Sequence, residues 1–265
     1  MPEFIMSLSN LKRLAVILVF CAAVSACAIP QWKQDQANSH LNIGAAFLGS
    51  ERFNDALKEF FKAEEFNPGD PKLHYYIGIA YYGKGMSDQA IVEFNKALSL
   101  KPDYSEAYNF LGTIFLGKGL WDKAIEAFNN ALSNTLYDTP DKALFNMGRA
   151  YHGKGNYQTA LNKYREAMSK KPNTIPPFLI EQHMGVASFA DGNTENAVHY
   201  FKKSLELEPS FLESRYWLGQ CYIKLNNLDE AKVQFQTIIK TAPEGELRNA
   251  ARKSLDSIDF VRYKP

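Results

Sequence analysis

Three glycine–lysine–glycine triplets and five histidines are the residues of this sequence whose types and spacing could do chemistry. The triplets begin at Gly83, Gly117 and Gly153. A glycine-rich loop with a lysine can cradle phosphate, but these triplets lack the Walker spacing and follow no predicted strand. Each falls between two predicted helices, where glycine can supply the positive φ that ends a helix. The triplets therefore indicate turns and no nucleotide site.

The histidines do not form a metal or catalytic group. They are His40, His74, His152, His183 and His199, and none belongs to a zinc-ligand motif such as HExxH or to a histidine–cysteine combination with a local signature. His40 and His74 lie one repeat period apart, which indicates equivalent packing positions. No local signature of a serine, cysteine or zinc hydrolase occurs. We expect no enzyme, no metal and no cofactor, and therefore a binding role.

The N-terminus predicts export. Residues 1–26 carry the basic pair Lys12 and Arg13, then an apolar run too short to span a membrane. The Val-Ser-Ala-Cys tetrapeptide that ends at Cys27 resembles the lipobox of bacterial lipoproteins. This resemblance implies that Cys27 is acylated, and the uncharged Ala28 favours the outer membrane. We expect a lipid-anchored protein at the periplasmic face of that membrane.

Charge and cysteine content agree with an exported binding protein. The formal net charge is +1 over 265 residues, so the chain has no broad basic surface and nucleic acid is excluded as a partner. Once Cys21 leaves with the signal segment and Cys27 is acylated, Cys221 is alone. No intramolecular disulfide is then possible, and Cys221 is interpreted as a small buried hydrophobe.

A regular spacing of glycine, alanine, aromatic residues and proline organises the chain. The lattice glycines, which recur at intervals of 34 to 37 residues, are Gly44, Gly78, Gly112, Gly148, Gly185 and Gly219. An alanine lies twelve residues after each, at Ala56, Ala90, Ala124, Ala160, Ala197 and Ala231. An aromatic residue follows four positions later, at Phe60, Phe94, Phe128, Tyr164, Phe201 and Phe235. Proline closes five of the six units, since it cannot continue a helix.

This lattice resembles the tetratricopeptide repeat (TPR) over residues 37–243. The resemblance implies an all-α, right-handed superhelix of six helix-turn-helix repeats, in which each repeat buries its apolar face on its neighbours. The predicted repeats are 37–70, 71–104, 105–138, 141–174, 178–211 and 212–243. Residues 27–36 are expected to be a lipidated tether, and residues 244–265 a capping helix and tail. Extra residues before the fourth and fifth repeats predict longer loops there.

By resemblance to other TPR arrays, the inner surface is lined by positions two, five, nine and twelve of each first helix. In this sequence these positions include Leu41, Leu48, Tyr75, Ile79, Tyr82, Asn109, Thr113, Leu116, Phe145, Arg149, His152, Gln182, Val186, Phe189, Tyr216, Gln220 and Ile223. The lysine and asparagine set that captures acidic C-termini in other TPR proteins is absent. The strip suits an apolar or amphipathic segment of a partner, although any single side chain could equally pack between helices.

One segment is more specific. Leu136-Tyr137-Asp138-Thr139-Pro140, with the downstream Ala143, Asn146 and Gly148, resembles the entry to the fourth repeat of the PilF/PilW/Tgl pilotins, which are type IV pilus biogenesis lipoproteins. The resemblance implies an outer-membrane lipoprotein that binds secretin subunits and promotes their insertion and multimer assembly. Two alternatives stay open: a TPR scaffold in another envelope machine, such as outer-membrane protein assembly or polysaccharide export, and an adaptor for a peptidoglycan hydrolase.

Overall fold

The computed structural model describes residues 29–170 and 174–262, and the regular structure in these ranges is entirely α-helical. The thirteen helices of the described ranges are α2 Gln31–Gly49, α3 Phe53–Phe66, α4 Pro71–Gly83, α5 Ser87–Leu100, α6 Ser105–Gly117, α7 Trp121–Ser133, α8 Pro140–Gly153, α9 Tyr157–Ser169, α10 Pro177–Ala190, α11 Thr194–Leu207, α12 Leu212–Lys224, α13 Leu228–Thr241 and α14 Glu246–Arg262. The predicted all-α fold of helix pairs is confirmed. The predicted signal segment and Cys27 lie outside the described residues.

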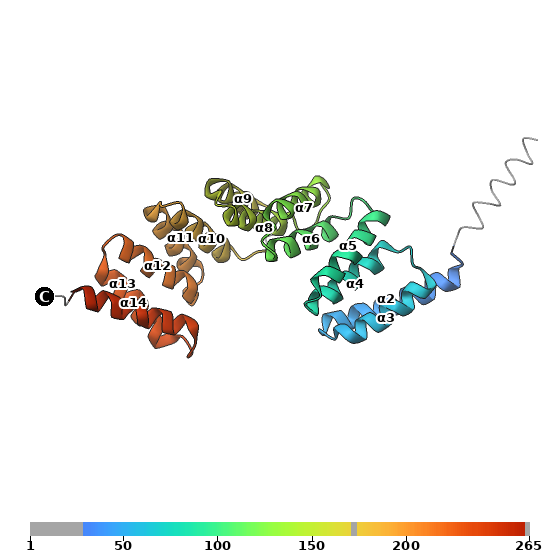
Figure 1. The fold of residues 1–265 in the computed structure, drawn as a ribbon, viewed down its shortest axis with the longest axis horizontal. Helices are drawn as coiled ribbons and strands as arrows, with labels where there is room; N and C mark the ends of the chain where they lie inside the picture. Colours follow the sequence, from blue (N-terminus) through green and yellow to red (C-terminus); the bar gives the residue numbers. More distant parts are fainter. Residues whose placement is uncertain (1–28, 171–173, 263–265) are drawn as a thin grey trace, which may run out of the picture. The chain divides into compact units, whose positions relative to one another are not determined.

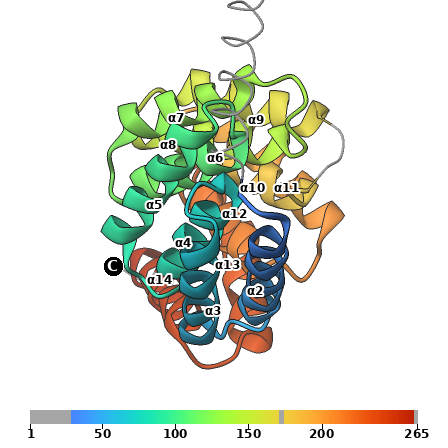
Figure 2. The same ribbon diagram turned by 90° about the vertical axis from the view of Figure 1, so that its right-hand side faces the viewer.

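The helices belong to two compact units, α2 to α5 in the first and α6 to α14 in the second. Inside each unit, the two helices of a pair pack together, as α2 does on α3 and α8 does on α9. The second helix of a pair then packs on the first helix of the next pair. Figure 1 shows this succession within the second unit, and Figure 2 shows α2, α3 and α4 of the first unit. Each pair thus buries its apolar face against its neighbours.

Each lattice glycine lies against the aromatic ring sixteen positions later in the chain. A Cβ atom built on any of these glycines would lie 2.4 to 2.7 Å from a ring carbon, a distance that real side chains do not adopt. The contacts are Gly44–Phe60, Gly78–Phe94, Gly112–Phe128, Gly148–Tyr164, Gly185–Phe201 and Gly219–Phe235. All six rings are at most 1% exposed. The repeat needs glycine here because only a residue without Cβ admits a ring so close to the helix backbone.

The turn inside each repeat has one backbone conformation. The residue seven positions after each lattice glycine has a φ between 56° and 84°, at Glu51, Gly85, Gly119, Gly155, Gly192 and Asn226. The turns predicted at the three glycine–lysine–glycine triplets are therefore confirmed, and the positive φ belongs to the second glycine of each triplet.

Polar pairs join the two helices of the first and second repeats. His40 Nδ1 lies 2.7 Å from Glu59 Oε2, and His74 Nδ1 lies 2.8 Å from Glu93 Oε2. The ring of His74 also places Nε2 2.9 Å from the carbonyl oxygen of Pro68. A carbonyl and a carboxylate both accept, so His74 donates from both nitrogens and is an imidazolium cation. The equivalent packing predicted for His40 and His74 is a polar contact of each ring with a glutamate of the second helix.

The predicted tether is wrong over residues 31–36, which form the start of α2. Trp32 packs edge-on against Phe66 with ring centroids 6.3 Å apart. Gln34 accepts a hydrogen bond of 3.0 Å from the side chain of Asn67. These partners lie more than thirty residues away in the sequence, so the polar composition of the segment concealed the helix.

The longer loops predicted before the fourth and fifth repeats are present, and one buried carboxylate organises the second. Asp141, 1% exposed at the start of α8, accepts hydrogen bonds through Oδ2 from the backbone nitrogens of Thr174 and Ile175, at 2.6 and 3.1 Å. In the first loop Tyr137 is buried, which raises the pKa of its hydroxyl to about 12, while Leu136 is 85% exposed. The loop before the fourth repeat therefore reaches α8 with the side chain of Tyr137 buried and that of Leu136 in solvent.

Helix α14 covers the end of the second unit. Its apolar stripe, which includes Ala251 and Ile258, joins the buried cluster around Phe235 and Ile238 of α13. A terminal helix with one apolar face is what a stack of repeats needs to protect its last pair from water.

We expect Gly112→Ala to lower the free energy of unfolding by about 1–3 kcal/mol, because its Cβ would overlap the Phe128 ring. Gly117→Ala is the matched control on the same helix, since a Cβ there meets nothing within 4 Å. Its effect should be at most about 1 kcal/mol and stabilising. Urea unfolding followed by circular dichroism measures both variants. Equal effects would contradict the glycine–ring constraint.

Stability should also depend on the protonation of His74. The Glu93 carboxylate raises the pKa of His74 above 6.5, against the effect of burial. A raised folded-state pKa stabilises the fold below the unfolded value, and this contribution is lost as the pH rises through the folded pKa. The loss of melting temperature in His74→Gln should therefore be larger at about pH 6 than at about pH 8.5. An equal loss at both pH values would mean that His74 is not protonated.

Candidate functional site

A pocket of about 370 Å³ opens among the first helices of the second unit, and we call it the groove pocket. Helices α6, α8, α10 and α12 each contribute to its lining, with two side chains from α7 and α9. The lining residues are Leu116, Trp121, Arg149, His152, Gly153, Tyr164, Gln182, His183, Val186 and Trp217.

Two tryptophans provide aromatic surface to the groove pocket. Trp121 begins α7 and packs over Gly153, where an added Cβ would lie 2.9 Å from the indole ring. Trp217, on α12, packs against Phe189 in a T-shaped contact with centroids 5.6 Å apart, and stacks on Phe201 at 6.5 Å. Large, rigid aromatic side chains of this kind are the commonest anchors of protein interfaces.

Four polar side chains, Arg149, His152, Gln182 and His183, line the pocket, and the first, second and last of them can carry a positive charge. Arg149 is exposed and donates to Asn146 Oδ1 at 3.2 Å. Burial lowers the pKa of His152, and its Nε2 is buried without a hydrogen-bond partner in the described part of the chain. Burial, with the nearby Arg149 and His152, lowers the pKa of His183 to about 4. At neutral pH the pocket thus presents one fixed cation and two neutral imidazoles.

His183 is oriented by aromatic neighbours beneath the pocket. Its ring lies edge-on to Phe145 at 4.9 Å and 5.8 Å from the ring of Tyr164. Tyr164 is in turn the ring that rests on the lattice glycine Gly148. The glycine–ring contact of the fourth repeat therefore supports the floor of the groove pocket.

The structure brings together Leu116, Arg149 and His152 of the predicted groove residues, with Gln182 and Val186. Phe145 is 5% exposed and lies under His183. Phe189 flanks Trp217 and faces the ammonium of Lys224 at 4.7 Å. Tyr216 and Ile223 pack against the apolar cluster of α13 and α14.

Asn109, Thr113 and Gln220 of the second unit do not line the groove pocket, and the remaining predicted groove residues lie in the first unit. Leu41 is 5% exposed in the core of α2, α3 and α4, and Leu48 packs against the same cluster. Tyr75 and Ile79 are half-buried, and Tyr82 is 37% exposed. Leu41 is thus a packing residue, and Tyr82 is the most exposed of these five.

Five lining residues are absent from the predicted groove set, and they are Trp121, Gly153, Tyr164, His183 and Trp217. Trp121 belongs to a second helix, and His183 and Trp217 each stand two positions before a lattice glycine, outside the chosen groove positions. The sequence did contain a signal for the position that His183 and Trp217 share. Tyr76 and Phe110 occupy that same position in other repeats, so bulky rings recur there.

The side chains that line the groove pocket are apolar, aromatic or nitrogen-bearing, and none of them is an acid or a cysteine. In residues 29–170 and 174–262 no group of three or more histidine, cysteine, aspartate or glutamate side chains could hold a metal ion. Cys221 is fully buried, which raises the pKa of its thiol to about 12. Within the same ranges no helix has the length and apolar content to cross a membrane. The pocket could hold an apolar or aromatic side chain while Arg149 and His152 meet an acceptor beside it.

Family models and a curated relative match parts of the chain. Three models of the tetratricopeptide repeat match residues 71–104, 103–172 and 188–254. The human protein O-mannosyl-transferase TMTC2 is 28% identical over 100 residues, which are 38% of this chain. This match spans only 12% of the length of TMTC2.

Two solved structures share the fold over most of this chain. PilF of Pseudomonas aeruginosa has a TM-score of 0.70 and 13% identity, and the match covers 84% of this chain and 99% of PilF. PilW, described as a widely conserved type IV pilus biogenesis factor, has a TM-score of 0.74 and 19% identity. Here the match covers 82% of this chain and 98% of PilW. At these identities the likeness is one of fold.

Proposed function

Since this chain is a tetratricopeptide-repeat protein, we propose that it serves type IV pilus biogenesis as a pilotin. It is an outer-membrane lipoprotein that binds secretin subunits through the groove pocket and promotes their insertion and multimer assembly. It acts by binding and carries out no catalysis. A TPR array presents its partners with a rigid, stacked surface, which suits this task.

The observation that carries the proposal is that the structural matches to PilF and PilW extend over most of this chain and nearly all of each of those proteins. The matches extend over 84% and 82% of this chain and nearly the full length of both proteins. The resemblance of the segment at 136–140 to the pilotins supports the same process.

The groove pocket supports the binding part of the proposal. Trp121 and Trp217 offer apolar surface, and the exposed guanidinium of Arg149 lies beside the unpartnered Nε2 of His152. A secretin segment that fits this pocket inserts an apolar or aromatic side chain and places a carboxylate or carbonyl oxygen near Arg149. Such a segment is amphipathic, in agreement with the groove expected from the sequence.

The proposed lipid anchor agrees with the first described residues. Ile29 and Trp32 follow Cys27 closely and are 40% and 58% exposed. Exposed tryptophan is favoured at the level of lipid headgroups. An acylated Cys27 would place both side chains near the membrane surface, and two or more acyl chains suffice for stable attachment.

The test is a strain that lacks the gene, complemented with variants, in which outer-membrane secretin is immunoblotted under conditions that preserve multimers. The wild-type gene should restore multimers. Arg149→Glu combined with His152→Ala should weaken secretin binding by about tenfold or more and reduce multimers. Lys240→Glu, an exposed charge reversal on α13, is the control and should restore them. Cys27→Ser should leave the protein outside the membrane fraction.

Unchanged multimers in the strain without the gene would refute the pilotin role and favour the envelope-scaffold alternative. Full activity of the Arg149 and His152 variant would refute the groove pocket as the binding site. Normal membrane fractionation of Cys27→Ser would refute the lipid anchor. Circular dichroism of each variant confirms that the fold is retained.

A further inference from the structure

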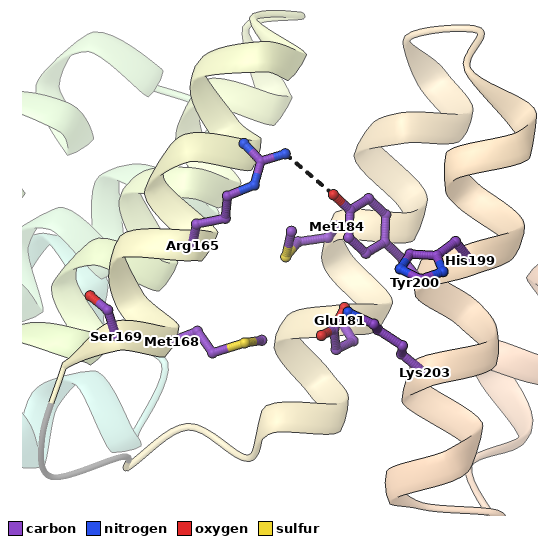
Figure 3. A pocket seen from close by; sticks show the side chains of 8 residues that line it. All are labelled: Arg165, Met168, Ser169, Glu181, Met184, His199, Tyr200 and Lys203. Carbon is purple, nitrogen blue, oxygen red and sulfur yellow. Dashed lines mark hydrogen bonds between the residues drawn. The ribbon is translucent and has the colours of Figure 1, made fainter.

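A second pocket, of about 410 Å³, lies between α9 and α11 with α10 as its floor, and we call it the α9–α11 pocket. It is lined by Arg165, Met168, Ser169, Glu181, Met184, His199, Tyr200 and Lys203. Figure 3 shows these side chains converging from the three helices on one space. None of them lines the groove pocket.

A comparison of equivalent positions in the repeats shows which polar pair is missing from this pocket. The residue four positions before a lattice glycine and the residue fifteen positions after it face each other across the two helices of a repeat. In three repeats they form a polar pair, and these pairs are His40–Glu59 at 2.7 Å, His74–Glu93 at 2.8 Å and Arg215–Gln234 at 3.1 Å. In each pair the first helix supplies a nitrogen group and the second supplies an oxygen acceptor.

The fifth repeat breaks this pattern. Its first-helix residue is Glu181, an acceptor, and the facing residue is Tyr200. The hydroxyl of Tyr200 accepts a hydrogen bond of 3.3 Å from Arg165 Nη2 in place of any bond to Glu181. The acid is therefore left without the cross-helix partner that the equivalent position has in the first, second and sixth repeats.

Glu181 is a buried carboxylate with an unused oxygen. Its side chain belongs to a residue that is 7% exposed, and Oε2 is buried with no hydrogen-bond partner among the described residues. Burial raises the pKa of this carboxyl, and the electrostatic effect of Lys203 and His199 opposes the rise only in part. An unpartnered buried carboxylate is costly, and a donor that enters the pocket would remove that cost.

The rest of the lining defines what such a donor must carry. Met168 and Met184 flank the approach to Glu181 with flexible, apolar thioether chains, which suit an aliphatic stem. Arg165 and Lys203 stand at the sides as cations. A ligand that fits has a cationic tip for Glu181, an apolar stem for the two methionines, and negative groups on either side of the stem.

We infer that the α9–α11 pocket is a docking site for a partner protein segment that inserts one arginine or lysine side chain, flanked by acidic residues, onto Glu181. The site lies between the second helices α9 and α11 on a floor formed by α10, and it shares no lining residue with the groove pocket. It does not depend on the secretin assignment. The chain would thereby hold two protein segments at once.

The test uses the full chain labelled at the methionine methyl groups with carbon-13 and two blocked tripeptides, Asp-Arg-Asp and Asp-Gln-Asp. The arginine peptide should shift the Met168 and Met184 signals saturably and leave those of Met86 and Met147 unchanged. The glutamine peptide should bind at least about tenfold more weakly, because its tip has no charge to pair with the carboxylate. Glu181→Gln should weaken the arginine peptide by a similar factor.

Glu166→Gln is the matched control, since Glu166 is an exposed carboxylate on α9 that pairs with Lys163 and does not line the pocket. It should bind the arginine peptide as the wild type does. Glu181→Gln should also raise the melting temperature, because it removes an unpartnered buried charge. The inference is overturned by equal affinity for the two peptides, by no saturable shift at Met168 and Met184, or by a lower melting temperature of Glu181→Gln.

Discussion

The contact between a backbone without a side chain and an aromatic ring is the constraint on which this structure depends. In all six repeats a lattice glycine of the first helix receives the ring of the second, at distances that exclude even a methyl group. The contact sets how closely the two helices approach, and the stacking of each pair on its neighbour follows from that approach. Because each repeat is stabilised mainly by its neighbours, this one spacing is maintained along both units.

The same contact also supports the sites. Tyr164 rests on Gly148 and forms part of the floor of the groove pocket, where it orients His183. A second contact of the same kind, Trp121 over Gly153, provides one wall. The pocket is thus built on aromatic rings, Tyr164 and Trp121, whose positions are fixed by their contacts with glycines of the repeats.

The sequence was sufficient for the fold because glycine, alanine and aromatic residues at a fixed period encode a contact inside each repeat. The groove positions were only partly predictable. Arg149 and His152 follow from the resemblance to other TPR arrays, whereas Trp121 and Trp217 lie at positions that this resemblance does not assign to the groove. The tether prediction failed for a similar reason, since Trp32 contacts Phe66 and nothing local in the segment indicates that partner. The sequence could not predict that Glu181 lacks a hydrogen-bond partner, because this depends on which side chains the facing helix α11 places beside it.

The most direct test is site-specific photo-crosslinking in living cells. A photoreactive amino acid replaces Arg149 in the groove pocket or Lys240 on α13, both of which are exposed. A groove that holds the secretin predicts a strong adduct with secretin subunits from position 149 and none from position 240. Adducts from position 240 alone, or adducts from position 149 with other envelope proteins and never with secretin, would contradict it.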